Sequence, residues 1–129
     1  MRDVPANRRA EWEAMGFTPD NCPVRRVLDH VAAKWTLLVL LELADGPERF
    51  NGLGRALPDI SKRMLTQTLR DLERDGLATR TVHDTKPPSV EYELTDRGRS
   101  LMGPLMGLVD WAEQNMAPIT EAQATYDAA

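Results

Sequence analysis

The apolar residues of this chain follow a helical period over much of its length. Pro23 suits the first position of a helix, because its missing N–H would have no partner there. The four apolar residues that follow it at helical spacing are Val24, Val27, Leu28 and Val31. Residues 37–41 form an unbroken apolar run, which is typical of a helix buried at the centre of a domain. The sequence Asp45-Gly46-Pro47 predicts the end of this second helix.

Two further helical segments are joined by a tight turn. Residues 50–57 predict a short third helix that two glycines weaken, and Pro58-Asp59 predicts a turn. Ser61 is a favoured N-cap residue for a fourth helix, which we expect to reach about residue 74 before Gly76 closes it. A short helix, a turn and a longer capped helix together predict a helix-turn-helix.

Beyond Gly76 the pattern changes to a period of two. The candidate strands cover residues 78–82 and 90–94, and in the second strand Val90, Tyr92 and Leu94 alternate with two glutamates. Alternation of this kind is typical of a strand with one buried face. The two segments therefore predict a β-hairpin with several residues at its tip.

The two ends of the chain differ in character. Thr95 is the predicted cap of a final helix over residues 96–117, and residues 118–129 read as a polar, acidic tail. At the other end, residues 1–21 form a polar arm with one or two helical turns around Trp12. The predicted architecture is mainly α with a small β-hairpin.

Length and composition place the chain among single-domain globular proteins. It has 129 residues, of which 42% are hydrophobic and 28% are charged, so one compact domain is expected. The longest apolar run is far too short to cross a bilayer, and no apolar stretch follows the first residues as it would in a signal peptide. The single cysteine, Cys22, excludes an internal disulfide. We therefore expect a cytoplasmic protein without membrane contact.

The formal net charge of −4 argues at first against a nucleic-acid partner, but the charge is unevenly distributed. Residues 49–80 contain seven basic and four acidic side chains, a local balance of +3, whereas residues 108–129 contain four acidic side chains and no basic one. Phosphate binding responds mainly to charges within roughly a Debye length of ~8–10 Å. The middle of the chain therefore remains a candidate for binding DNA.

The predicted fourth helix separates its polar and apolar residues. At ~100° per residue, one arc of about 140° holds mostly hydrogen-bond donors: Lys62, Arg63, Thr66, Gln67, Arg70 and Arg74. A second, non-overlapping arc predicts the side that faces the core: Met64, Leu65, Thr68, Leu69 and Leu72. An amphipathic helix alone is more typical of an ordinary surface helix. The adjacent hairpin, with basic Arg80 and Lys86, makes a winged helix-turn-helix the favoured interpretation.

The residue types on the polar arc suit both bases and phosphates. Arginine can bond guanine with two hydrogen bonds, glutamine can pair with adenine, and threonine can contact a base edge or a thymine methyl. The predicted base-contacting residues are Lys62, Arg63, Thr66, Gln67 and Arg70. Ser61 lies where a cap hydroxyl and free amides meet a phosphate. Arg80 and Lys86 are expected to contact the backbone or the minor groove from the hairpin.

The chain resembles the HxlR-type branch of bacterial winged-helix regulators, which are related to the MarR group. Blocks in the family's order carry the resemblance over residues 22–116: Cys22-Pro23-Val24, Lys34-Trp35-Thr36-Leu37-Leu38-Val39-Leu40, Arg49-Phe50-Asn51-Gly52-Leu53, residues 60–73, Asp75-Gly76-Leu77, residues 88–95 and Gly98. The resemblance implies a DNA-binding domain over residues 22–95 and a regulator, most commonly a repressor. Gly52 departs from the family, which commonly has glutamate there.

The resemblance also implies a homodimer that binds a pseudo-palindromic operator in double-stranded DNA, with the first and last helices at the two-fold axis. The expected interface residues are Val24 and Leu28, and Leu101, Leu105, Leu108, Val109, Trp111, Ala112 and Met116 on the final helix. The alternative is that the final helix packs only on its own domain.

Cys22 is the candidate for redox chemistry, since some members of the resembled family sense oxidants or electrophiles with a cysteine at this place. A helix N-terminus and the nearby Arg25 and Arg26 would lower the pKa of its thiol. Any protein disulfide would have to join two subunits. A small, half-buried structural residue is the alternative.

Other classes of function find less support in the sequence. The chain has no metal-ligand spacing, no glycine-rich phosphate loop and no set of nucleophile, base and orienting group, so neither an enzyme nor a cofactor is expected. A winged helix that binds protein rather than DNA stays open as the alternative function. No small-molecule effector is specified by the sequence.

Overall fold

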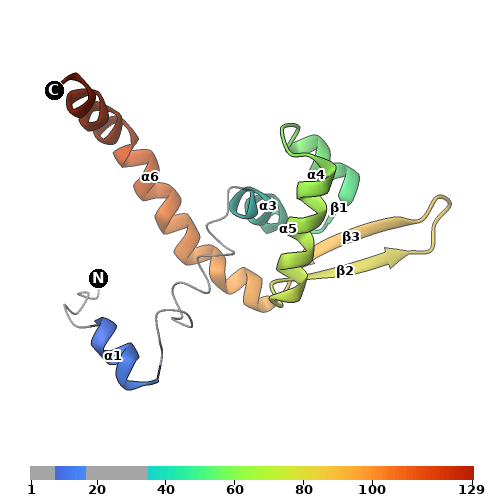
Figure 1. The fold of residues 1–129 in the computed structure, drawn as a ribbon. Helices are drawn as coiled ribbons and strands as arrows, with labels where there is room; N and C mark the ends of the chain where they lie inside the picture. The colour runs from blue at the N-terminus through green and yellow to red at the C-terminus, as the bar shows by residue number, and fades with distance from the viewer. Residues whose placement is uncertain (1–7, 17–34) are drawn as a thin grey trace.

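A computed structural model describes residues 8–16 and 35–129 (Figure 1). Its elements are α1 (Arg8–Ala14), α3 (Thr36–Ala44), β1 (Glu48–Arg49), α4 (Phe50–Ala56), α5 (Lys62–Arg74), β2 (Ala78–His83), β3 (Ser89–Leu94) and α6 (Asp96–Ala128). The mainly helical fold with a small antiparallel sheet confirms the predicted class. The predicted helix after Pro23, with Cys22, Val24 and Leu28, lies outside the described residues.

The core forms where α3, α4 and α5 meet the sheet and the first turns of α6. Its most fully buried members lie on three helices that correspond to predicted ones: Val39, Leu40 and Leu43 of α3, Leu53 of α4, and Leu65, Leu69 and Leu72 of α5. Tyr92 and Leu94 of β3 and Leu105 of α6 complete the cluster. Full burial of a leucine side chain is favourable by about 1.5–3 kcal/mol, so these contacts hold α5 firmly against the domain.

The sheet has the strand order β1-β3-β2, with every pair antiparallel. The hairpin of β2 and β3, called the wing below, extends one residue further on each strand than the sequence predicts, from Ala78↔Leu94 to His83↔Ser89. Strand β1 was not predicted, because its two residues are polar and have no alternation. It forms through backbone pairing of Glu48 with Tyr92 and of Arg49 with Glu91.

The ends of α5 are closed by the residues that the sequence predicts. The Ser61 hydroxyl accepts a hydrogen bond from the backbone N–H of Met64 at 3.1 Å. At the other end Gly76 has φ +75°, and the N–H groups of Gly76 and Leu77 donate to the carbonyls of Glu73 and Leu72. This is a Schellman motif, which turns the chain sharply from α5 into the wing.

Helix α6 begins as predicted and ends later than predicted. Thr95 Oγ1 accepts from the N–H of Gly98 at 3.1 Å, which confirms the predicted cap. The helix then continues through Pro104 and Pro118 to Ala128, so residues 118–128 are helical rather than a tail. Each proline removes one helical hydrogen bond. Figure 1 shows the distal part of α6 projecting away from the other helices and the sheet of residues 35–129.

Candidate nucleic-acid interface

Helix α5 presents its two faces largely as its sequence predicts. Leu65, Thr68, Leu69 and Leu72 are buried. The side chains of the polar arc point outward: Lys62, Arg63, Gln67, Arg70 and Arg74 are exposed, and Thr66 is half-buried. Met64 is the exception to the predicted core face, since it is 44% exposed. Its position in the first turn of α5 sets it at the margin of the core.

Side chains on the exposed face of α5 make hydrogen bonds within the helix. The Thr66 hydroxyl donates to the Lys62 carbonyl at 2.8 Å, which leaves its methyl group as the part free for an apolar contact. Gln67 Nε2 donates to Asp71 Oδ1 at 3.0 Å. Among the described residues, Lys62, Arg63 and Arg70 form no ion pair, so their charges remain available to an anionic ligand.

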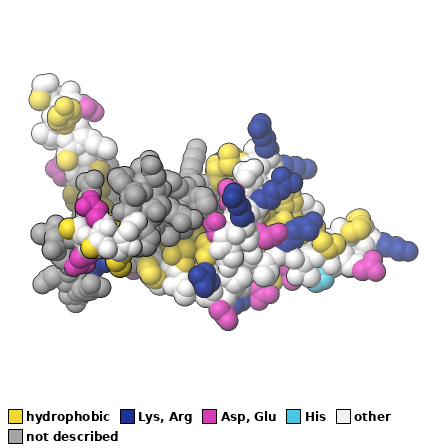
Figure 2. All heavy atoms as spheres, turned by 60° about the horizontal axis from the view of Figure 1, so that its bottom comes forward, with side chains coloured by type: hydrophobic (Ala, Val, Ile, Leu, Met, Phe, Trp, Pro, Cys, Tyr) yellow, Lys and Arg dark blue, Asp and Glu magenta, His cyan; other side chains and the backbone are white. Residues whose placement is uncertain are grey.

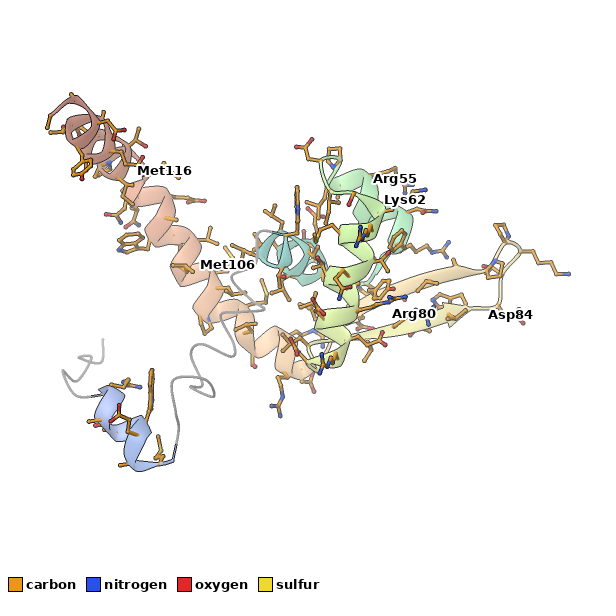
Figure 3. All side chains as sticks on the ribbon, viewed as in Figure 1. Arg55, Lys62, Arg80, Asp84, Met106 and Met116 are labelled. Atoms are coloured by element: carbon orange, nitrogen blue, oxygen red, sulfur yellow. The ribbon has the colours of Figure 1, made fainter. Side chains whose placement is uncertain are left out.

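The wing carries two of the predicted cations. Arg80 is exposed on β2 opposite Tyr92, and Lys86 is exposed in the loop at the tip, where Asp84 also lies. Figure 3 shows Arg80 on the wing close to the body of the domain and Asp84 at its far end. The wing therefore offers one basic residue near α5 and another at its tip, about as far out as the hairpin reaches.

Arg49 and Arg55 are candidate binding residues that the sequence analysis did not select. They lie at the two ends of α4, and both line an open groove of about 600 Å³ between α4 and the wing. A smaller hollow of about 330 Å³ continues from Arg55 to Lys62 at the start of α5. Figure 3 shows Arg55 and Lys62 next to each other on the side toward which the wing extends.

The charged side chains that line these two hollows are all basic. They are Arg49, Arg55, Lys62 and Lys86. Figure 2 shows Lys and Arg side chains gathered on the half of the molecule that carries α4, α5 and the wing. The local excess of basic residues in the sequence is the signal that could have found Arg49 and Arg55. The local charge balance does not indicate which of those basic residues the fold brings together on one surface.

Comparison with known proteins agrees with this geometry. Residues 30–120 match the family described as HxlR-like helix-turn-helix. The chain belongs to this family. It is 41% identical over 109 residues to the HTH-type transcriptional regulator YdeP of Bacillus subtilis (strain 168), covering 84% of this chain and 85% of that one.

Solved structures extend the agreement to the fold. The transcriptional regulator YtfH from Salmonella typhimurium superimposes with a TM-score of 0.73 at 38% identity, covering 81% of this chain and 94% of that one. The redox regulator HypR in its reduced form gives a TM-score of 0.72 at 39% identity, covering 77% and 98%. The protein is thus a transcriptional regulator of the helix-turn-helix type with the winged-helix fold. None of its described helices has the length and apolar character needed to cross a membrane.

The apolar stripe on α6 of this HxlR-like protein divides into two parts. Leu101 is partly buried against the core and Leu105 is only 6% exposed, so these two side chains pack on their own domain. Beyond them Leu108, Trp111 and Met116 are each more than half exposed, and Ala112 is exposed too. Figure 3 shows Met106 and Met116 along this projecting part of the helix.

Proposed function

We propose that the protein is a homodimeric repressor that binds a pseudo-palindromic operator through α5 and the wing. The observation that carries the proposal is the exposed face of α5. Its basic side chains Lys62, Arg63 and Arg70 form no ion pair among the described residues, and buried leucines hold the helix from behind. Beside it lie two hollows whose charged lining residues are all basic. Helices of this kind enter the major groove with their N-terminal residues foremost. Lys62, Arg63, Thr66, Gln67 and Arg70 are then the base-contacting residues.

The remaining basic residues of this surface suit the phosphate backbone. Ser61 lies at the N-terminus of α5, where its own O–H and the free amides of the first turn can donate to a phosphate. Arg49 and Arg55 line the groove beside α4, and Arg80 and Lys86 lie on the wing. Contacts to phosphate position the protein on the duplex and carry no sequence information of their own.

Binding of the full chain to DNA from the promoter region of its own gene, measured by fluorescence anisotropy over a range of salt, tests the proposal. We expect affinity to fall steeply with salt. Arg63→Ala should cost about 1–3 kcal/mol and relax the preference for particular bases. Arg55→Ala should weaken binding to all sequences and reduce the salt slope by about one. Arg97→Ala, which removes an exposed arginine of α6, is the matched control and should change little.

Two results would reject DNA binding through this surface. One is equal loss of affinity in the Arg63 and Arg97 variants. The other is a complex whose affinity does not depend on salt, which would favour a winged helix that binds another protein.

We further propose that Cys22 makes the regulator responsive to oxidants. The support is the single cysteine of the chain together with its similarity to the redox regulator HypR, for which both reduced and oxidised forms have been solved. Diamide accepts two electrons and two protons as two thiols form one disulfide, so oxidation should join two chains through Cys22. We expect this dimer on non-reducing gels, with altered operator affinity. An oxidant response that survives Cys22→Ser would contradict the proposal.

A further inference from the structure

The side chain of Gln67 is held by a carboxylate on the same helix. Its Nε2 donates to Asp71 Oδ1 at 3.0 Å, one turn further along α5. Asp71 lies about 180° around the helix from Lys62, at the border between the exposed face and the core, and is half-buried. Gln67 itself is exposed. The carboxylate therefore holds the amide from the inner side and leaves its outer side open.

Within the part of the chain that the structure describes, the side chain of Asp71 has Gln67 as its single hydrogen-bond partner. Arg70 and Arg74 are its near neighbours in sequence, yet neither forms an ion pair with it among the described residues. A negative charge at the edge of a surface that binds phosphate weakens binding to every DNA sequence. Because Asp71 would lower the affinity for DNA of any sequence, we look for its role in the discrimination between bases.

A carboxylate fixes the direction of an amide as well as its position. Ionised aspartate only accepts hydrogen bonds, whereas the glutamine amide has an N–H₂ group on one side and an oxygen on the other. Only the N–H₂ group can face Asp71, so a half-turn of the amide is excluded. Gln67 is left with one N–H and the oxygen Oε1 for a ligand. This donor and acceptor match the N7 acceptor and N6–H donor of adenine.

We propose that Asp71 is a positioning residue that fixes the Gln67 amide so that it selects adenine over guanine. Guanine offers two acceptors, O6 and N7, at the same place in the major groove. To satisfy both, the amide would have to turn both of its N–H donors outward, and the bond to Asp71 removes one of them. The inference rests on the proposed function, since it concerns how the same helix reads its operator.

The experiment measures base preference in a set of variants of the full chain. Each A·T pair of the operator is first replaced by G·C, and the affinities of wild type and Gln67→Ala are compared. The pair contacted by Gln67 is the one whose replacement lowers the affinity of wild type but not that of Gln67→Ala. Discrimination at that pair is then measured for wild type, Asp71→Asn and Asp71→Glu. Asparagine has the size of aspartate but can pair with Gln67 in either orientation, whereas glutamate keeps an acceptor that is charged. Glu73→Gln removes an exposed acidic charge from the same helix and is the matched control.

We expect wild type to prefer A·T by on the order of tenfold, and Asp71→Asn to lower this to about twofold. Asp71→Glu and Glu73→Gln should keep most of the preference. A uniform rise in affinity for both sequences in Asp71→Asn, with the ratio unchanged, would mean that Asp71 acts only through its charge and would overturn the inference. The inference would also be overturned if Asp71→Glu lost the preference for A·T as fully as Asp71→Asn.

Failure of the proposed function would look different. Wild-type protein would then bind neither sequence, so no preference between A·T and G·C could be measured. The hydrogen bond itself can be checked without DNA in the ¹H–¹⁵N spectrum of the side-chain amides, with Gln67→Ala used for assignment. The amide proton of Gln67 that faces Asp71 should lie further downfield and exchange more slowly in wild type than in Asp71→Ala, where its acceptor is missing. Identical behaviour in wild type and variant would remove the structural basis of the inference.

Discussion

Gly98 is the residue on which the junction between α5, the wing and α6 depends. It is buried at the start of α6, and a Cβ at this position would overlap the backbone carbonyl of Leu77. The same carbonyl accepts a hydrogen bond from the N–H of Thr95 at 3.0 Å, and Thr95 Oγ1 donates to the Gly76 carbonyl at 2.7 Å. The chain can approach itself this closely only where a side chain is absent.

Gly98→Ala should therefore destabilise the protein by about 1–3 kcal/mol, because the overlapping group is backbone and cannot move aside. Gly103→Ala is the control. It lies in the same helix with nothing within 4 Å of the added Cβ, and it should stabilise by up to about 1 kcal/mol through helix propensity. The free energies of unfolding from urea titrations distinguish the two. Equal stability of both variants would show that α6 can shift at its base without cost.

At the scale of the element, α5 is the part of the molecule that the sequence predicts best. Its apolar period, Ser61 and Gly76 all indicate the same helix, and the structure has it from Lys62 to Arg74. Where local signals agree in this way, the bounds of an element can be predicted without knowledge of its distant contacts. Strand β1 has no such signal, since it exists only through its pairing with β3. The grouping of Arg49 and Arg55 beside the wing likewise depends on how α4 packs.

Ser61 combines a structural and a proposed binding role, and substitution can separate them. Ser61→Ala should cost about 1 kcal/mol of stability, because the Met64 N–H loses its acceptor. Ser61→Asp keeps an equally good cap, so its free energy of unfolding should stay within a few tenths of a kcal/mol of wild type. Its carboxylate would nevertheless repel a phosphate at the start of α5, and DNA affinity should fall by several-fold or more.

Thermal unfolding and operator binding measured on the same samples check both expectations. A stable Ser61→Asp variant that binds operator as wild type does would place the DNA backbone away from this helix end, and the proposed docking of α5 would have to change.

At the scale of the whole molecule, α6 is the element whose extent could not be predicted. Its first turns have the apolar period of a helix that packs on its own domain, and Leu105 is used in that way. Further on the apolar period continues, but the side chains are exposed: Leu108, Trp111, Met116 and Ile119. Exposure of this apolar stripe to water is unfavourable in a monomer, whereas packing against the same stripe of a second chain would bury it. Leu101 and Leu105, which pack on their own domain, are accordingly left out of the proposed interface.

The proposed dimer can be broken by one charge on this stripe. Leu108→Glu replaces a side chain that is 55% exposed, so the fold of the protomer should tolerate it, whereas a pair of carboxylates buried between two α6 helices would not be tolerated. We expect sedimentation equilibrium to give the mass of one chain for Leu108→Glu and of two for wild type. Operator affinity should fall in parallel, because a single protomer reaches only one half-site. Gln114→Glu adds the same charge to an exposed position of α6 outside the stripe and should remain dimeric. If both variants keep the wild-type mass, the protomers meet elsewhere, and the distal part of α6 must have another use.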